Sequence, residues 1–192
     1  MAKVTRLLVI RHALTEIKEN LQKPATPLSD EGRFQTQRLA ARLAATETKI
    51  HIFYSSQYAR AAQTAKILAA KFDAKVKKTA DLNEIGVATS PTQLHSPKIS
   101  PQKYEEELGL LHRAQDKAIE FLRTVSFEHV GEAVGVVAHG NIIRGIIAES
   151  LGAGVETVVR LKVNNASLSI LEYDKGGEFF RLSLFNDTSH LD

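Results

Sequence analysis

The chain has 192 residues and contains no cysteine. It can therefore form neither disulfides nor thiolate metal sites, which fits a reducing compartment and makes the cytoplasm the expected location. No apolar run approaches the length of a membrane-spanning helix, and the apolar stretch at residues 7–10 is too short for the core of a signal peptide. We therefore expect a soluble protein without a membrane partner.

Internal repeats and low-complexity tracts are also lacking. Proline gathers only at residues 24–27 and 91–101, and neither stretch looks like an interdomain linker. A hydrophobic content of 43% over this length is sufficient for one sizeable core and small for two independent ones. We predict a single domain over residues 1–192.

The charge balance is mildly basic, with a net charge of +3 and a pI of about 9.1. This balance favours anionic ligands without identifying them. Basic residues cluster at Lys71, Lys75, Lys77 and Lys78, but no nucleic-acid motif surrounds them. A solvated face is the simpler interpretation, and no nucleic-acid partner is expected.

Short apolar, β-branched segments recur along the chain and predict strands at residues 4–10, 50–54, 74–78, 134–138 and 168–173. A further segment at 178–184 follows a pair of glycines and predicts an added antiparallel edge strand. Because helical patterns alternate with the strands, we predict an α/β fold. Its architecture is a three-layer α/β/α sandwich with a mostly parallel central sheet.

The helical patterns have recognisable starts. Ser29 is predicted to cap the first helix, with acidic residues in its first turn, and Ser55 or Ser56 to cap the second. A long third helix is expected over about residues 102–125, and a fourth after Gly140.

Charged and imidazole side chains follow the predicted strands at the point where each strand ends. They are Arg11 and His12, Arg60, Glu84 and His139, after the first, second, third and fourth strands. Because open α/β sheets bind ligands at these carboxyl ends, we expect the five side chains to converge. Guanidinium groups match phosphate oxygens, a neutral imidazole is a capable nucleophile, and a partly desolvated carboxyl holds a proton. The set suits a phosphate ester.

Five motifs in order carry a family resemblance: LVIRHA at 8–13, LSDEG at 28–32, YSSQYARAAQTA at 54–65, LNE at 82–84 and VAHG at 137–140. With these motifs the chain resembles the histidine phosphatase superfamily, also called phosphoglycerate mutase-like. The likeness runs from Val4 to the NDTSHL tail at 186–191, and its ending is similar to that of the small phosphatases of the family.

The resemblance implies a phosphatase that hydrolyses phosphate monoesters through a phosphohistidine and needs no metal or other cofactor. In that mechanism His12 is the nucleophile and Glu84 the proton donor, while Arg11, Arg60 and His139 bind the phosphoryl group and stabilise its transition state. Additional substrate contacts are expected from Thr15, Lys18 and Gly140. For Thr15, a local bond from its hydroxyl to the backbone is an equal alternative.

Three departures from the family pattern stand out. Ala13 replaces the usual glycine after the nucleophile, which would strain the loop if that position needs a positive φ. Lys18 stands where a phosphate-binding asparagine is common, with Asn20 two residues further on. The aromatic and glycine residues that commonly follow the proton donor are missing, so a lid-like insertion at about 85–101 is expected to differ from the familiar ones.

Other interpretations stay open at this point. The altered lid and Ala13 are compatible with a catalytically impaired regulatory domain that binds phosphorylated ligands. A phosphoglycerate mutase-type phosphotransferase is disfavoured by the short stretch between Glu84 and His139. Glu16 and Glu107 are alternative acids, and His12, Glu16 and His139 would be the ligands of a metal-dependent hydrolase.

The expected partner is a small phosphorylated substrate, and the chain is expected to be a monomer or homodimer. Sugar phosphates, glycerate phosphates, nucleotide-like esters and phosphoproteins all remain compatible with the residues above.

Overall fold

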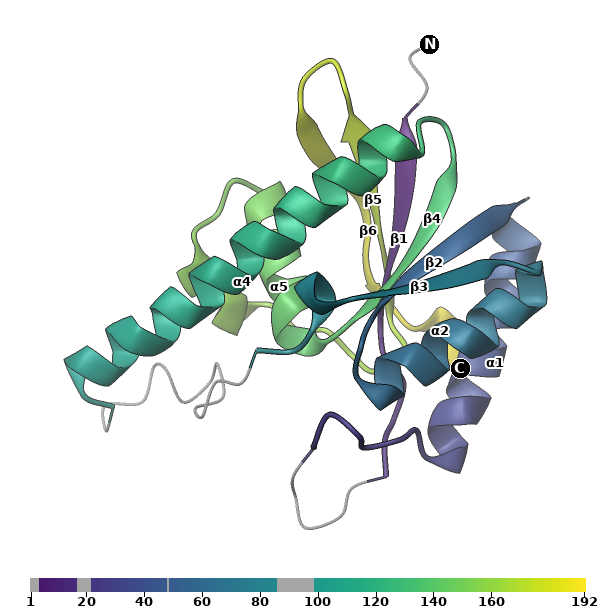
Figure 1. Cartoon of the computed structure of the whole chain (residues 1–192), viewed down its shortest axis with the longest axis horizontal. Coiled ribbons are helices and arrows are strands. Elements are labelled where there is room, and N and C mark those ends of the chain that lie inside the picture. The colour runs from purple at the N-terminus through teal and green to yellow at the C-terminus, as the bar shows by residue number, and fades with distance from the viewer. Residues whose placement is uncertain (1–3, 17–21, 48, 86–98) are drawn as a thin grey trace.

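A computed structural model describes residues 4–16, 22–47, 49–85 and 99–192. Within these ranges six strands form one sheet in the order β3-β2-β4-β1-β5-β6 (Figure 1). The strands are β1 (Thr5–Arg11), β2 (Ile50–Ser56), β3 (Lys75–Thr79), β4 (Ala133–Ala138), β5 (Leu168–Asp174) and β6 (Phe179–Asp187).

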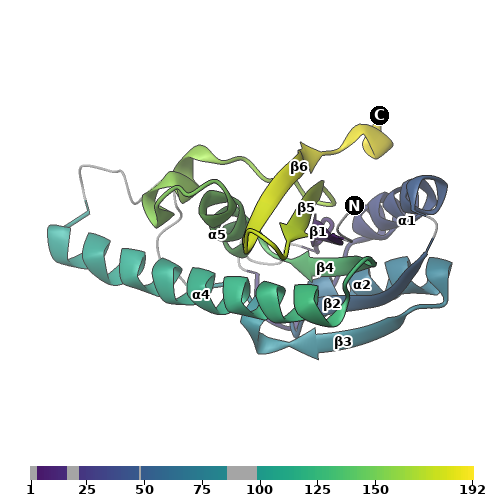
Figure 2. The ribbon, with the colours of Figure 1, turned by 90° about the horizontal axis from the view of Figure 1, so that it is seen from above.

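Helices cover both faces of the sheet, as predicted. They are α1 (Asp30–Thr46), α2 (Ala59–Phe72), α4 (Pro101–Glu128) and α5 (Gly140–Ser150), with short 3-10 turns η1 (Ala80–Leu82), η2 (Val155–Arg160) and η3 (Ser189–Leu191). Figure 2 shows α1 and α2 on one side of the sheet and α4 and α5 on the other. The three-layer α/β/α sandwich is confirmed.

Four strands, β3, β2, β4 and β1, are parallel, whereas β5 and β6 each run antiparallel to their neighbour. The predicted antiparallel edge strand is therefore β6, but β5 is antiparallel as well. The chain enters β5 at Leu168, which pairs with Ile10 near the carboxyl end of β1. Because β5 starts where β1 ends, it can only run back along it.

The central strands are buried on both faces, which explains their nearly continuous apolar sequences. In β1, Leu7 and Val9 pack with α4 and α5, while Leu8 and Ile10 pack with α1 and α2. The alternation follows from the two-residue period of a strand. Apolar side chains thus pack both helix layers against the sheet. Polar residues lie at its carboxyl edge.

One predicted helix cap is confirmed and the other is wrong. The Ser29 hydroxyl accepts a hydrogen bond from the backbone N–H of Gly32 at 3.1 Å and caps α1. By contrast, β2 extends through Ser55 and Ser56, and α2 begins after Tyr58, whose side chain makes no cap bond. The Ser56 hydroxyl is instead bonded to residues from other elements, which local sequence could not indicate.

The long third helix also exceeds its predicted limits. Pro101 occupies its first turn and Glu128 is its last residue, so α4 begins inside the predicted insertion at 85–101. Residues 86–98 of that insertion lie outside the described residues. Within the described ranges, no helix has the length and apolar character needed to cross a membrane.

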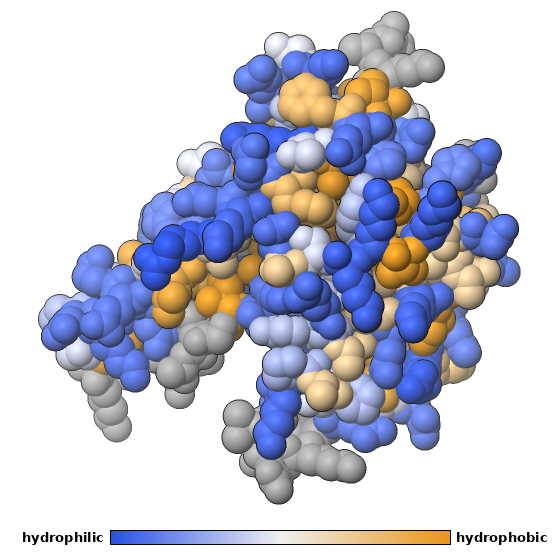
Figure 3. All heavy atoms as spheres, in the orientation of Figure 1, coloured by the Kyte–Doolittle hydropathy of each residue, from blue (hydrophilic) through white to orange (hydrophobic). Residues whose placement is uncertain are grey.

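The lysine cluster is exposed, as expected of a solvated face. Lys75, Lys77 and Lys78 lie on β3 at the edge of the sheet, and Lys71 lies in the last turn of α2. Charged side chains on an edge strand oppose pairing with a second sheet. Hydrophilic residues cover most of the face seen in Figure 3.

Gly32 offers a test of how α1 contacts the loop after the predicted nucleophile. A Cβ at this position would lie 2.0 Å from the carbonyl oxygen of Leu14. We expect Gly32→Ala to lower the free energy of unfolding by about 1–3 kcal/mol in urea titrations, because backbone on both sides must shift. Gly109→Ala in α4 is the control: its Cβ would meet only the end of the Arg113 side chain, at 3.4 Å, and a gain of roughly 0.5–1 kcal/mol is expected. Equal stability of the two variants would contradict this.

Candidate active site

The five side chains predicted to converge come from four parts of the fold that meet at the carboxyl edge of the sheet. Arg11 ends β1 and His12 follows it, Arg60 lies in the first turn of α2, Glu84 follows η1, and His139 is the residue before α5. The rings of His12 and His139 are 5.0 Å apart, and Arg60 Nε lies 3.2 Å from His12 Nε2. The convergence expected from strand ends is present in the structure.

His12 is buried and held in one tautomer. Its Nδ1 lies 2.8 Å from the carbonyl oxygen of Ala13, which can only accept, so Nδ1 carries the proton. Its Nε2 accepts from Arg60 Nε–H and is therefore unprotonated, with its electron pair directed at the guanidinium. Burial, with added repulsion from Arg60 and Arg11, lowers the pKa of His12 to about 3. The ring is neutral at physiological pH, as a nucleophile must be.

His139 is fully buried beside His12 and the ring of Tyr58, whose centroid is 5.2 Å away. Its Nε2 lies 2.8 Å from the Ser56 hydroxyl, and its buried Nδ1 has no hydrogen-bond partner in the described ranges. Burial, and repulsion from His12, Arg60 and Arg11, hold the pKa of His139 far below its usual value. This imidazole is therefore also neutral before any ligand arrives.

The two arginines are held by backbone carbonyls rather than by carboxylates. Arg11 donates to the carbonyl of Val163 at 2.5 Å, and its buried Nε has no partner among the described residues. Arg60 is 3% exposed, donates to the carbonyl of Lys23 at 3.1 Å, and lies with its guanidinium carbon 5.2 Å from the Tyr58 ring centroid. Within the part of the chain that the structure describes, no carboxylate forms an ion pair with either guanidinium, so both can bind a phosphoryl group.

Glu84 lies at the amino end of α5. One carboxyl oxygen accepts from the backbone N–H of Ile85 at 3.1 Å, and the other lies 3.5 Å from the N–H of Asn141. Burial raises the pKa of Glu84, although these bonds and the charges of Arg60 and Arg11 oppose the rise. A carboxyl with a raised pKa retains its proton at higher pH, which is the property of a proton donor.

Ala13 does not strain the loop after the nucleophile. It is absent from the described non-glycine residues with positive φ, so its backbone needs none of glycine's freedom. Its methyl group is buried in a small cluster with Leu28 and Ala166.

The remaining predicted contacts differ in outcome. The Thr15 hydroxyl accepts a hydrogen bond from the Gln22 amide at 2.8 Å and can still donate its own proton, so its substrate contact stays a prediction. Gly140 is the first residue of α5, and a Cβ there would lie 3.6 Å from the Arg11 guanidinium carbon, so backbone and guanidinium are close. Lys18 and its alternative Asn20 lie outside the described residues.

The alternative acids lie in different surroundings. Glu16 is exposed, and Glu107 is buried on α4 and stays an alternative. Among the residues that the structure describes, no three His, Cys, Asp or Glu side chains are grouped as metal ligands. His12, Glu16 and His139 therefore do not form the site that a metal-dependent hydrolase would require.

Several polar residues at the site escaped sequence reasoning. Ser56 and Asn83 join His139 to the loop that carries Glu84, and the Asn165 amide donates to the His12 carbonyl at 3.1 Å. Arg144 donates to the Asn141 side chain at 3.2 Å, and its buried Nε has no partner among the described residues. The position of Arg144 one turn after Gly140 was the available signal, since residues i and i+4 share a helix face.

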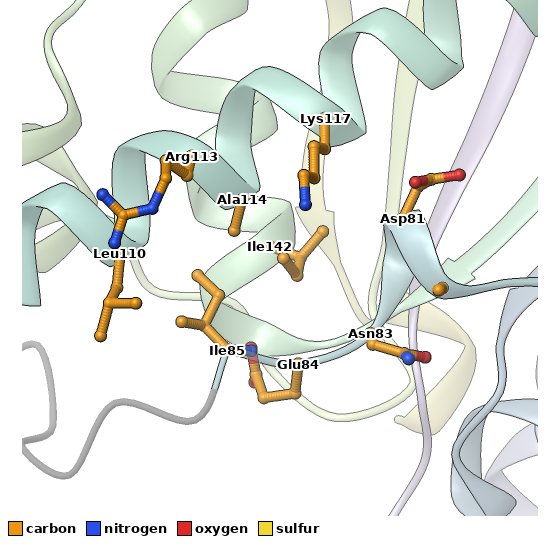
Figure 4. A pocket seen from close by; sticks show the side chains of 10 residues that line it. Asp81, Asn83, Glu84, Ile85, Leu110, Arg113, Ala114, Lys117 and Ile142 are labelled. Carbon is orange, nitrogen blue, oxygen red and sulfur yellow. The ribbon is translucent and has the colours of Figure 1, made fainter.

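A pocket of about 270 Å³ lies between α4 and the segment that carries Glu84 (Figure 4). Ile85, Leu110 and Ile142 form an apolar wall. Lys117 extends from α4 towards the space, and Arg113 lies one turn before it. The pocket therefore lies next to Glu84 and has an apolar surface and the positive charges of Arg113 and Lys117.

Comparison with known proteins matches residues 7–188 to the family model of the histidine phosphatase superfamily (branch 1). Phosphoglycerate mutase-like protein 4 of Arabidopsis thaliana is 31% identical, with 97% of this chain and 86% of that protein aligned. The metal-independent phosphoserine phosphatase of the same plant is 26% identical over 99% of this chain and 84% of that protein.

Solved structures show the same fold. Phosphoserine phosphatase from Entamoeba histolytica, crystallised with 3-phosphoglyceric acid, superposes with a TM-score of 0.77 at 20% identity, covering 98% of this chain and all of that chain. Mycobacterial glucosyl-3-phosphoglycerate phosphatase gives a TM-score of 0.71 at 23% identity, covering 97% and 99% of the two chains.

The site geometry predicts binding of inorganic phosphate with a contribution from Arg60. Phosphate is expected to raise the Tm of the wild type in thermal unfolding. Arg60→Met should weaken the Kd about tenfold to a hundredfold, because hydrogen bonds to charged groups contribute roughly 1.5–3 kcal/mol. Arg123→Met, at an exposed position on α4, is the control and should bind phosphate like the wild type. Unchanged affinity in Arg60→Met would contradict the assignment.

Proposed function

The chain belongs to the histidine phosphatase superfamily (branch 1), and from this membership we propose that it is a metal-independent phosphatase acting on phosphate monoesters through a phosphohistidine at His12. One observation carries the proposal. His12 is a buried, neutral imidazole whose unprotonated Nε2 lies beside the Arg60 guanidinium. An uncharged nucleophile next to an anion-binding group is what attack on phosphorus needs.

In the first step His12 Nε2 forms a bond to phosphorus while the bond from phosphorus to the ester oxygen breaks. Glu84 transfers its proton to that oxygen, so the leaving group departs as a neutral alcohol. The hydrogen bond from His12 Nδ1 to the Ala13 carbonyl stabilises the positive charge that develops on the ring. Arg60, which covers Nε2 before substrate binds, exchanges this contact for a phosphoryl oxygen.

In the second step water attacks the phosphohistidine. The Glu84 carboxylate accepts the proton of that water, the bond from phosphorus to Nε2 breaks, and inorganic phosphate and the starting enzyme are formed. No electron donor or acceptor is required. The raised pKa of Glu84 supports both roles, because the group that gave a proton readily takes one back.

Arg11, Arg60 and His139 are proposed to stabilise the charge on the three non-bridging oxygens. In phosphoryl transfer this charge is spread over the equatorial oxygens, so fixed donors contribute more in the transition state than in the ground state. Removal of one such donor raises the barrier by about 3 kcal/mol, roughly a hundredfold in rate.

The proposed substrate is a small phosphorylated metabolite. The pocket beside Glu84 has space and charge for a leaving group with a polar or anionic end, through Arg113 and Lys117. Relatives named as phosphoserine phosphatase and phosphoglycerate mutase-like proteins are compatible with this class. The cytoplasmic location and the monomeric or homodimeric state stay predictions.

The nucleophile is tested with an aryl phosphate in excess EDTA. Wild-type turnover is expected to continue, and intact-mass detection after a rapid acid-free quench should show one added phosphoryl group. His12→Ala should lose both, whereas His51→Ala, at an exposed position of β2, should retain both.

Activity that disappears in EDTA and returns with zinc or manganese would overturn the mechanism. A wild type that binds phosphate but turns over no ester would favour the regulatory domain, and transfer to an added alcohol in place of water would favour the phosphotransferase.

The proton donor is tested by varying the leaving group. Glu84→Gln should lower kcat for an alkyl phosphate about 10²–10⁴-fold and for 4-nitrophenyl phosphate far less, because nitrophenolate leaves without a proton. The raised pKa of Glu84 keeps its acid form present above the usual carboxyl range, so wild-type turnover of the alkyl ester should fall as pH rises through that pKa. The pH profile of Glu84→Gln should lack this decrease at high pH. Glu16→Gln is the control, and equal losses with both esters would refute the role.

A further inference from the structure

Hydrogen bonds around Asn83 determine the orientation of its side-chain amide. The backbone N–H of Gln57 points at Asn83 Oδ1 at 2.9 Å, and a backbone N–H can only donate. The Asn83 amino group in turn donates to the side-chain oxygen of Gln57 at 3.3 Å. The atom of Asn83 that faces β2 is therefore its oxygen, an obligate acceptor.

This orientation commits the hydroxyl proton of Ser56. Ser56 Oγ lies 2.8 Å from Asn83 Oδ1, so the hydroxyl must donate there. It also accepts from the backbone N–H of Tyr58 at 3.1 Å. With its only proton used, Ser56 can offer His139 nothing but an electron pair.

The tautomer of His139 follows. Its Nε2 lies 2.8 Å from Ser56 Oγ and must carry the proton, which leaves Nδ1 unprotonated, buried and without a partner among the described residues. His12 has the opposite tautomer, with Nδ1 protonated and Nε2 accepting from Arg60. Each of the two neighbouring rings thus has one unprotonated nitrogen, and neither has an N–H left to offer to an anion.

We propose that Ser56, oriented by Asn83, is a positioning residue that holds His139 as its Nε2–H tautomer, so that His139 Nδ1 takes up one proton when a phosphoryl group binds. The inference rests on the proposed function only in placing the phosphoryl group at His12 and His139. Two electron pairs, one on Nδ1 and one on a phosphoryl oxygen, repel each other. A proton between them turns this repulsion into a charge-assisted hydrogen bond.

The proton balance is simple. A bound phosphoryl dianion draws one proton from solvent, and a monoanion brings it along. The proton stays on Nδ1 through phosphoryl transfer, so His139 supplies a positive charge in both steps. It returns to solvent when inorganic phosphate leaves.

The surroundings explain why the proton arrives with the ligand and not before. The charged and titratable groups facing His139 are Arg11 from the end of β1, His12 after it, and Tyr58 and Arg60 from the start of α2. The carboxyl of Glu84, after η1, interacts with the same two guanidinium groups. Without a ligand, burial and the two guanidinium charges disfavour a cationic ring. A phosphoryl group brings at least one negative charge into the same space and reverses the balance.

Nitrogen-15 NMR of histidine-labelled full-length protein tests the inference directly. His12→Gln and His139→Gln spectra assign the two rings, and wild-type protein is then recorded free and with inorganic phosphate, at a pH well above the second pKa of phosphate. In the free protein His139 should show a protonated Nε2 and an unprotonated Nδ1. With phosphate both nitrogens should be protonated, and calorimetry in buffers of different ionisation enthalpy should show net proton uptake.

Ser56→Ala frees His139 to place its proton on Nδ1, so phosphate binding should no longer take up a proton. With an aryl phosphate we expect kcat to fall roughly tenfold, the difference between a charge-assisted and a neutral hydrogen bond, and its pH profile to flatten on the alkaline side. Ser55→Ala is the matched control: it removes a buried hydroxyl of the same strand that bonds only the Ser56 carbonyl, and should leave uptake and profile unchanged. Asn83→Asp preserves the acceptor and should keep the tautomer, whereas Asn83→Ala should behave like Ser56→Ala.

The outcomes separate this inference from the proposed function. A proton on Nδ1 in the free wild type, or phosphate binding without protonation of His139, overturns the positioning role even if turnover and phosphohistidine are normal. Absence of phosphate binding overturns both. The expected NMR states in a protein that turns over no ester would uphold the role of Ser56 and refute the phosphatase.

Discussion

Burial of two imidazoles among unneutralised guanidinium groups is the constraint on which the site depends. Burial keeps His12 unprotonated, as the proposed nucleophile must be, while Arg11 and Arg60 stay charged at any physiological pH. Backbone carbonyls of Val163 and Lys23 hold the guanidinium groups without cancelling their charge. The positive charge of the two guanidinium groups is stabilised when an anion binds. Anion binding and the activation of His12 therefore depend on the same electrostatics.

Proton placement links parts of the site that are remote in sequence. Asn83 orients the Ser56 hydroxyl and thereby His139, and the next residue, Glu84, is the proposed proton donor. The Tyr58 hydroxyl lies 3.5 Å from the Glu84 carbonyl, so the start of α2 contacts the same segment. A displacement of this short stretch would therefore disturb Glu84 and His139 together.

The fold and most of the site residues were predictable because their signals are local. Apolar strands followed at once by Arg11, His12 or His139 predict both a buried sheet and its ligand-binding edge. Predictions failed where a residue's partner lies far along the chain. Ser56 has the composition of a helix cap and does bond the nearby N–H of Tyr58. Its other partners come from the residue after η1 and from the residue before α5, which no local pattern contains. The direction of β5 likewise depends on where η2 returns the chain.

The sequence by itself determined the order of strands and helices, the five side chains that meet at the carboxyl edge, and the membership of a family. These depend on periodicity and on position after a strand, which are properties of the chain. Only the tertiary structure decided which nitrogen of each histidine carries a proton, and that Ala13 needs no glycine conformation. A tautomer is selected by the donor or acceptor that packing brings within 3 Å or so of the ring. That partner is chosen by the whole fold and not by the neighbouring residues.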